Sequence, residues 1–260
     1  MGRQKLGQHF LVNRHIAQKI VKPLFSHNGN IFEIGPGKGI LTELIVELKP
    51  GKHFIAVEKD PALYENLKRT LSNKVEFINS DILDIDPGQL FNKGQTYLVS
   101  NVPYNISKEL IDWILTFNKY FPQGVLMVQK EFYLKMISEP ASKEYNPRSI
   151  LFNMIYNIKK IIEVKPGSFS PPPKVNSTVF IFEAKKDKMI TGKISEDFYS
   201  FLKIIFHNRR KTLSNNLARS YSPEKIRSLL QSQNIPLNIR GEQLAGDILY
   251  NLFLHLNTDQ

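Results

Sequence analysis

The segment Asn101-Val102-Pro103-Tyr104 follows a short apolar run and holds the residues best suited to chemistry on an amine. The amide oxygen of Asn101 and the backbone carbonyl oxygen of Val102 can accept the two hydrogens of an exocyclic amine. Pro103 fixes the local backbone and biases the residue before it toward an extended conformation, which aims that carbonyl. Tyr104 offers a face on which a nucleobase that has left its helix can stack. The same residues could also form an ordinary turn that opens a helix.

The amine that suits these two acceptors is N6 of adenine. Its lone pair is delocalised into the ring, so it is a poor nucleophile. Acceptors on both hydrogens would localise the lone pair toward a methyl donor. No strong general base is needed, because the proton can leave after the methyl group has been transferred. The segment therefore predicts a catalytic site for adenine methylation.

A glycine-rich turn, Gly35-Pro36-Gly37-Lys38-Gly39, follows an earlier apolar run. Glycine lets the backbone approach a ligand closely, so we expect Gly35 and Gly37 to line a cofactor site. The dinucleotide fingerprint G-x-G-x-x-G would need glycine at position 40, where the chain has Ile40. An ordinary tight turn is the alternative.

Two carboxylates follow the next expected strands. Glu58 comes at the end of the second expected strand, which covers 54–57, and an acid at this position can accept hydrogen bonds from both ribose hydroxyls. Asp81 follows the third strand and could accept the N6 hydrogens of an adenine ring, although Asp is also a common turn residue. With the glycine turn, these acids describe an adenosine pocket without an evident pyrophosphate site. This favours S-adenosylmethionine over NAD as the cofactor.

The elements that would position these residues alternate between apolar runs and helical patterns. Expected strands are 31–34, 54–57, 75–78, 97–99 and 125–128, and expected helices are 39–48, 61–71 and 107–117. This alternation predicts an α/β fold with a parallel, doubly wound sheet, as in Rossmann-like methyltransferases. Ligands of such sheets bind beyond the carboxyl ends of the strands.

The pattern changes after Tyr156. Expected strands at 158–164 and 175–182 flank a proline-rich segment, and such a pair commonly closes an α/β sheet with an antiparallel edge. A polar linker follows, and then helical patterns at 195–205, 211–218, 223–233 and 241–256. We therefore expect a cofactor-binding catalytic domain at 1–184, with a basic N-terminal arm, and a small all-helical second domain at 193–260.

The charge of the chain favours a polyanionic partner. Its 260 residues carry 35 Lys and Arg against 24 Asp and Glu, a formal net charge of +11. No acidic residue precedes Glu33, and a second acid-free stretch at 198–223 contains Arg209, Arg210 and Lys211. Two separated basic segments fit an extended anionic surface such as RNA better than a small metabolite. A basic protein without a nucleic-acid partner is the alternative.

Several classes of site and location are excluded or disfavoured. The chain has no Cys, which excludes disulfides and Cys-ligated metals, and its histidines lack metal-ligand spacing. No apolar run approaches the length of a membrane span, and no signal-peptide core is evident. We expect a cytoplasmic protein without a metal ion. We also expect a monomer, because no heptad pattern or long exposed apolar edge is present.

The motifs together resemble the ribosomal RNA adenine dimethyltransferases. The resemblance is strongest to the bacterial small-subunit type, which dimethylates two adjacent adenosines near the 3′ end of the rRNA. The matching segments run almost end to end, at 6–11, 33–39, 58–60, 101–107, 128–131, 166–175 and 206–213.

The resemblance adds residues that the patterns alone do not select. It implies that His9 and Leu11, on an N-terminal arm, contact the cofactor, as do Gly35, Glu58, Asp81 and Asn101. It implies that Phe169 holds the target base opposite Tyr104, although a core phenylalanine is an equally good interpretation without it. It also supports rRNA-backbone contacts by Arg209, Arg210 and Lys211, on the immature small ribosomal subunit. Position 9 is often Asn in this family and position 102 is often Leu.

Three alternatives stay open. A large-subunit rRNA methyltransferase is disfavoured by the proline-rich segment, by the expected helix with Arg209-Arg210-Lys211 and by Asn105-Ile106-Ser107. A DNA adenine methyltransferase usually carries two prolines where this chain has Val102-Pro103. A nucleic-acid-binding factor that does not need methylation is disfavoured by intact Glu58, Asp81 and Asn101, which do not exclude a second, non-catalytic role.

Overall fold

The computed structural model describes residues 9–26, 29–48, 53–91, 96–186 and 190–257. It divides into two compact units. The first comprises Met1–Tyr133 and Asn157–Ala184, and the second comprises Leu134–Tyr156 and Lys185–Gln260.

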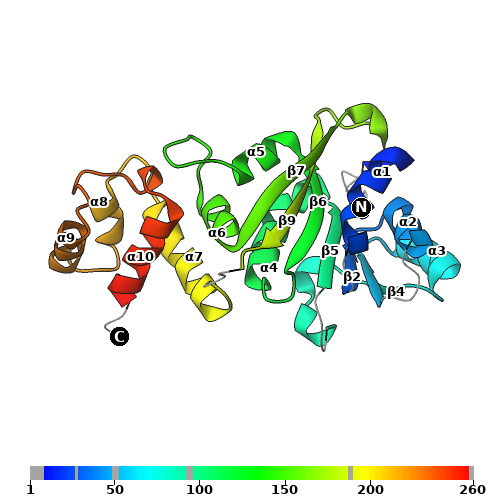
Figure 1. Cartoon of the computed structure of the whole chain (residues 1–260), viewed down its shortest axis with the longest axis horizontal. Coiled ribbons are helices and arrows are strands. Elements are labelled where there is room, and N and C mark those ends of the chain that lie inside the picture. Colours follow the sequence, from blue (N-terminus) through cyan, green and yellow to red (C-terminus); the bar gives the residue numbers. More distant parts are fainter. Residues whose placement is uncertain (1–8, 27–28, 49–52, 92–95, 187–189, 258–260) are drawn as a thin grey trace, which may run out of the picture. The chain divides into compact units, whose positions relative to one another are not determined.

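The first unit is built on a seven-stranded sheet with the strand order β4-β3-β2-β5-β6-β9-β7 (Figure 1). Strands β2 to β6 pair in parallel, and β9 runs antiparallel to β6. This confirms the predicted α/β class and the antiparallel strand added to a parallel sheet. The strands are β2 (Asn30–Ile34), β3 (Phe54–Glu58), β4 (Glu76–Asn79), β5 (Thr96–Asn101), β6 (Gln123–Gln129), β7 (Tyr156–Val164) and β9 (Ser177–Ala184).

Helices connect the parallel strands as the alternating pattern predicts. They are α2 (Ile40–Leu48), α3 (Pro61–Leu71) and α4 (Ser107–Thr116). Helix α5 (Lys130–Met136) follows β6 and was not predicted. Short 3-10 turns include η2 (Ile82–Asp84) and η4 (Tyr104–Ile106). Asp60 is the N-cap of α3, because its side chain accepts hydrogen bonds from the N–H groups of Ala62 and Leu63. Trp113 is 6% exposed and packs against Phe32 and Phe121, so it belongs to the core.

The carboxyl ends of β2, β3, β4 and β5 lie at one edge of the sheet because these strands are parallel and in register. Ile34 pairs with both Val57 and Ser100, and Glu58 pairs with Asn79. The glycine turn, Glu58, Asp81 and Asn101 each stand at or just beyond one of these strand ends. The fold thus gathers at one edge the residues that the sequence analysis selected separately.

An N-terminal segment, residues 9–12, crosses this edge, and we call it the strap. Strand β1 (Phe10–Leu11) pairs antiparallel with β8 (Phe169–Ser170), in register Phe10 with Ser170 and Leu11 with Phe169. Helix α1 (Arg14–Val21) follows, capped by the side chain of Asn13, and packs against α2. Neither the small sheet nor α1 was predicted.

The second unit is helical. Its helices are α6 (Pro147–Ile155), α7 (Lys193–Ile205), α8 (Leu213–Leu217), α9 (Pro223–Ser232) and α10 (Gly246–Asn257). Phe198, Phe201 and Phe253 form its aromatic centre. The expected helix at 241–256 is instead the 3-10 turn η6 (Gly241–Gln243) followed by α10.

The boundary between the units differs from the predicted one. Residues 134–156 precede β7 in the chain but belong to the second unit. The reason is the packing of α6, which buries Ile150, Leu151 and Phe152 and contacts α7 and α10. Among the described helices, none is long and apolar enough to cross a lipid bilayer.

Candidate active site

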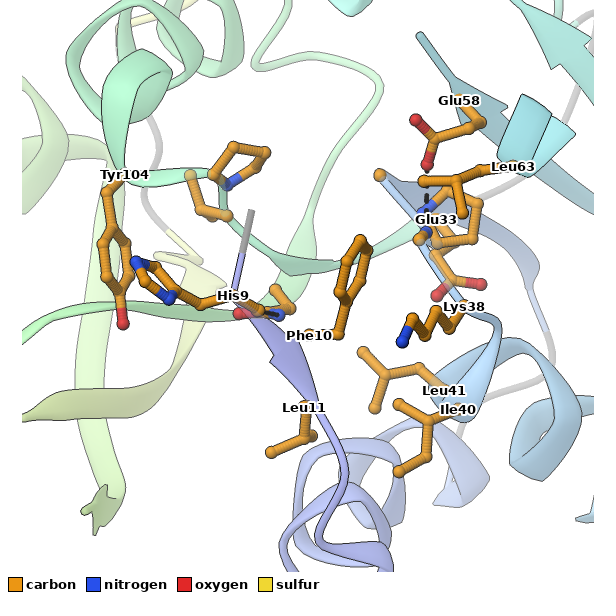
Figure 2. A pocket seen from close by; sticks show the side chains of 16 residues that line it. His9, Phe10, Leu11, Glu33, Lys38, Ile40, Leu41, Glu58, Leu63 and Tyr104 are labelled. Carbon is orange, nitrogen blue, oxygen red and sulfur yellow. Dashed lines mark hydrogen bonds between the residues drawn. The ribbon is translucent and has the colours of Figure 1, made fainter. Parts of the chain in front are cut away.

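A pocket opens at the carboxyl edge of the sheet in the first unit (Figure 2). Its walls come from the strap, the glycine turn and the segment after β5. They are His9, Phe10, Leu11, Glu33, Gly35, Pro36, Gly37, Lys38, Ile40, Leu41, Glu58, Leu63, Asn101, Val102, Pro103 and Tyr104.

A second cavity shares Gly35, Glu58 and Pro103 with the first. Its remaining walls are Ile34, Val57, Lys59, Ser80, Asp81, Ile82, Asn105 and Ile106. The two cavities therefore lie next to each other along the strand ends. A ligand with a nucleoside at one end and a reactive group at the other could span both.

The glycine turn has a backbone that other residues rarely adopt. Gly35 has φ +65° and Gly37 has φ +60°. A Cβ atom on Gly37 would also lie only 3.1 Å from a ring carbon of Phe10. The Phe10 ring points into the pocket, and the Lys38 ammonium lies over it, 4.9 Å from the ring centre (Figure 2). The structure thus brings both glycines predicted for the cofactor site to the pocket wall.

Glu58 is held in place by two backbone N–H groups. Its Oε2 accepts a hydrogen bond from Gly37 N, and its Oε1 accepts one from Asp60 N, both at 2.9 Å. The side chain is buried, and this burial raises the pKa of Glu58, although the N–H donors oppose the shift. Each carboxylate oxygen has a second lone pair, so both oxygens can still accept a hydroxyl from a ligand.

Asp81 lines the second cavity, as predicted for an adenine contact. Its Oδ1 accepts a hydrogen bond from Leu83 N, and its Oδ2 pairs with the Lys59 ammonium at 2.5 Å. Partial burial favours the protonated acid, but the hydrogen bonds from Lys59 and Leu83 outweigh it and lower the pKa of Asp81. The ionised carboxylate is a hydrogen-bond acceptor only, which suits the donor edge of adenine.

The amide of Asn101 is oriented by the strap. Its Nδ2 donates a hydrogen bond to the backbone carbonyl oxygen of His9 at 3.3 Å. The amide oxygen is thereby left as the group available to accept a hydrogen bond in the pocket. The next residue is fixed as well, because Val102 N donates to the carbonyl oxygen of Met127 at 3.0 Å. Both residues predicted to act on the amine therefore have one group held by the protein at the end of β5.

Tyr104 stands at the opposite end of the pocket from Glu58, beside the imidazole of His9 (Figure 2). The two ring centres are 5.6 Å apart, with 36° between the ring planes. The Tyr104 hydroxyl shares a hydrogen bond with the Ser177 hydroxyl, 2.6 Å between the oxygens. Burial raises the pKa of Tyr104, so its phenol stays neutral.

The strap brings His9 and Leu11 to the pocket, where the family resemblance places them. His9 Nδ1 lies 2.8 Å from the carbonyl oxygen of Pro171, so this nitrogen carries the hydrogen and donates it. Val12 N donates to the carbonyl oxygen of Ser168 at 2.9 Å, which ties the end of the strap to the proline-rich segment.

Phe169 lies in the core instead of the pocket wall. It is 4% exposed, pairs with Leu11 across the small sheet and packs within the main hydrophobic cluster. This placement argues against the predicted contact between Phe169 and the target base, because the apolar core encloses the ring. The aromatic neighbour that Tyr104 has in this structure is His9.

Glu33 is a pocket residue that the sequence analysis did not select. It is 1% exposed, and its Oε2 accepts a hydrogen bond from the Thr42 hydroxyl at 2.7 Å. Within the described part of the chain, its Oε1 has no hydrogen-bond partner. Burial raises the pKa of Glu33 to about 8. The available signal was an acid inside an otherwise apolar strand, where a charge is costly unless it serves a ligand.

The basic triplet in the second unit divides into two roles. Arg209 donates through Nε to the Glu242 carboxylate, through Nη1 to the Lys143 carbonyl and through Nη2 to the Ser142 carbonyl. Its guanidinium nitrogens all have protein partners, which argues against the predicted phosphate contact. Arg210 and Lys211 are exposed. Neither has an ion pair within the ranges that the structure describes, and they precede α8 instead of lying on a helix.

Potential metal ligands are scattered over the part of the chain that the structure describes. Within it, no group of three or more His, Cys, Asp or Glu side chains could hold a metal ion.

The family model described as ribosomal RNA adenine dimethylase matches residues 1–257. The ribosomal RNA small subunit methyltransferase A of Mycoplasmopsis pulmonis is 35% identical over 256 residues, 98% of this chain and 98% of that protein. The protein of the same name from Pelagibacter ubique is 35% identical, over 96% of this chain and 95% of that one. A crystal structure of a dimethyladenosine transferase from Plasmodium falciparum shares the fold. It has a TM-score of 0.81 and 24% identity, over 96% of this chain and 98% of that one.

Proposed function

The chain belongs to the ribosomal RNA adenine dimethylase family, and we propose that its pocket works on the immature small ribosomal subunit. The enzyme transfers methyl groups from S-adenosylmethionine to N6 of two adjacent adenosines near the 3′ end of small-subunit (16S) rRNA. The product is N6,N6-dimethyladenosine. Relatives named as small-subunit enzymes favour this substrate over large-subunit rRNA.

The two neighbouring cavities fit the cofactor. Glu58 would receive the ribose hydroxyls and Asp81 the adenine amino group, with Gly35 and Gly37 allowing the backbone to approach. Glu33 adds a buried carboxyl group whose Oε1 has no partner among the described residues, and a cationic ligand beside it would favour its ionised form. When bound, S-adenosylmethionine supplies an electrophilic methyl group on a positively charged sulfur.

Asn101 and Val102 would act on the target amine. The Asn101 amide oxygen and the Val102 carbonyl oxygen would accept its two hydrogens, which directs the nitrogen lone pair toward the methyl donor. Tyr104 would hold the flipped base by stacking. The observation that carries this assignment is the hydrogen bond from Asn101 Nδ2 to the His9 carbonyl, because it turns the acceptor oxygen of the amide away from the strap.

Arg210 and Lys211 would bind rRNA phosphates from the second unit. Both side chains are exposed, and both lie in a stretch without acidic residues. Contacts to phosphates set the position of the enzyme on the rRNA and carry no base specificity. We further propose that the enzyme acts as a monomer in the cytoplasm, where small subunits are assembled in bacteria.

The direct test incubates the protein with small ribosomal subunits that lack these methyl groups and with labelled S-adenosylmethionine. Mass spectrometry of the rRNA should find the label as N6,N6-dimethyladenosine at two adjacent adenosines near the 3′ end. Asn101→Ala is the matched control and should leave the rRNA unmodified. Label on large-subunit rRNA, or on no RNA, would contradict the proposal.

A further inference from the structure

The Ser177 hydroxyl contacts the Tyr104 hydroxyl, and the chemistry proposed above gives this contact no role. Its oxygen lies 2.6 Å from the hydroxyl oxygen of Tyr104, 73 residues earlier in the chain. Ser177 is completely buried, whereas the Tyr104 ring is only partly buried and faces the pocket. The contact therefore joins a side chain at the site to a fixed point inside the sheet.

The sheet holds Ser177 in place. Ser177 is the first residue of β9 and pairs with Gln129, the last residue of β6. Just beyond this pair, Lys130 N donates a hydrogen bond to the carbonyl oxygen of Asn176 at 2.9 Å. The register of the two strands is therefore closed by backbone bonds on both sides of Ser177.

A charged cluster next to Ser177 also stabilises this part of the sheet. Glu163 Oε1 accepts hydrogen bonds from Lys130 Nζ at 3.0 Å and from Asn176 Nδ2 at 2.7 Å. These donors, Lys130 first and then Asn176, lower the pKa of Glu163 to about 2. The Glu163 carboxylate is thus ionised near neutral pH, where it can hold both donors.

We propose that Ser177 is a positioning residue for methyl transfer, which fixes the position of the Tyr104 ring through the bond between the two hydroxyls. This inference rests on the proposed stacking role of Tyr104. A tyrosine ring swings as a whole about its Cα–Cβ bond, and an anchor on the hydroxyl at its far end stops that swing. Without the anchor, the ring is free to turn toward the neighbouring imidazole of His9, and the stacked base would turn with it.

The positioning matters because the reacting nitrogen must meet both acceptors at the end of β5. A small rotation of the stacked base moves its N6 away from Asn101 and Val102, and misplaced reactants lose rate steeply. Removing the anchor should therefore lower kcat. The affinity for S-adenosylmethionine should not change, because it depends on Glu58 and Asp81.

A double-mutant cycle of Ser177→Ala and Tyr104→Phe tests the proposal. Each single variant should lower kcat by about three- to tenfold, the effect of one neutral hydrogen bond. The double variant should be no slower than either single variant, because both changes remove the same bond. Cofactor affinity, measured by calorimetry, should match the wild type in all three. Additive losses, or normal kcat in Tyr104→Phe, would overturn the proposal.

Thr178→Val is the matched control. Thr178 is the next residue of β9, is 1% exposed, and has a hydroxyl without a hydrogen-bond partner among the described residues. Its side chain points to the other face of the sheet, and kcat should not change. Should Ser177→Ala fail to fold, Tyr104→Phe alone decides, because a lower kcat supports the anchor and an unchanged kcat contradicts it.

Tyr104→Ala separates this inference from the proposed function. If the ring stacks on the base, Tyr104→Ala should be much slower than Tyr104→Phe. Normal kcat in Tyr104→Ala would contradict the stacking role itself. A slow Tyr104→Ala together with a normal Tyr104→Phe would overturn only the role of Ser177.

Discussion

The amide nitrogen of Asn101 donates a hydrogen bond to the backbone carbonyl oxygen of His9, 92 residues away in the sequence. The residue that would activate the target amine is therefore oriented by the N-terminal strap and not by its own strand. Because His9 acts here through its backbone, the contact does not depend on which side chain stands at position 9. This accounts for a histidine where the family often has asparagine.

The first prediction concerns this orientation. Asn101→Ala should lower kcat by about 10²–10³-fold, as removal of one group aimed at a reacting centre does in other enzymes. Asn101→Asp keeps an acceptor oxygen but loses the donor to His9, and should also be severely impaired. Single-turnover kinetics at saturating rRNA measures both.

His9→Asn is the control for the strap, because it keeps the backbone carbonyl that accepts from Asn101. Its kcat should stay close to the wild-type value. Affinity for rRNA should be nearly the same in every variant of this set, and a parallel loss of rRNA binding in Asn101→Ala would mean that the residue mainly maintains the fold.

The second prediction concerns Glu58. Glu58→Ala should weaken binding of S-adenosylmethionine by about 1.5–3 kcal/mol, the range for hydrogen bonds to a charged group. Part of this loss should come from the turn, because Gly37 N and Asp60 N lose their acceptor. Glu58→Gln can still accept one of these bonds and should bind with intermediate affinity.

Calorimetry gives both affinities directly. An exposed acid on α2, Glu43, supplies the control variant Glu43→Gln, which should bind the cofactor normally. Wild-type affinity in Glu58→Ala would remove Glu58 from the cofactor site.

Much of the site was predictable because it follows strand ends. Gly35, Glu58, Asp81 and Asn101 each come directly after an apolar run, and parallel strands bring such ends to one edge. Local sequence therefore carried the information that placed them together. The same logic predicted most strands and helices of the first unit, with small shifts at their ends.

What the sequence did not predict depends on contacts between distant segments. Strand β1 has two residues and exists only because β8 pairs with it, so no periodic pattern could signal it. The core position of Phe169 follows from the same pairing. Arg209 looked like a phosphate ligand because its partners, Glu242 and two backbone carbonyls, lie far away in the sequence.

The third prediction is a pH dependence of stability. The pKa of Glu33 is about 8 in the folded protein, against an ordinary value of 4.5 that the unfolded chain should show. Between these values the unfolded chain loses a proton that the folded protein retains, so folding becomes less favourable as the pH rises. Above about pH 8 both forms are ionised, and the penalty is then complete.

Glu33→Gln removes this dependence while keeping the shape of the side chain. The melting temperature of the cofactor-free wild type should fall relative to that of Glu33→Gln between pH 5 and 8, and the difference should level off above that range. Differential scanning fluorimetry across this range measures it. Parallel curves for the two proteins would mean that Glu33 is ionised in the fold throughout.

The fourth prediction separates Arg209 from its neighbours. Arg210→Ala combined with Lys211→Ala should weaken rRNA binding broadly and flatten the dependence of log K on log salt by about 0.7–0.9 for each phosphate that the variant no longer neutralises. Arg209→Ala should instead lower the melting temperature, because Glu242 and the carbonyls of Ser142 and Lys143 lose their donor. Its salt dependence should keep the wild-type slope.

Binding titrations at several salt concentrations, paired with melting curves, distinguish these outcomes. The set of modified adenines should stay the same in both variants, since phosphate contacts do not read bases. The double variant should also keep the wild-type rate at saturating rRNA, because the residues of the proposed chemistry lie in the first unit. If Arg209→Ala flattened the salt dependence as much as the double variant, this would show that the Arg209 guanidinium of the wild type leaves Glu242 and binds rRNA. If the double variant kept the wild-type slope, Arg210 and Lys211 would be ordinary solvated cations.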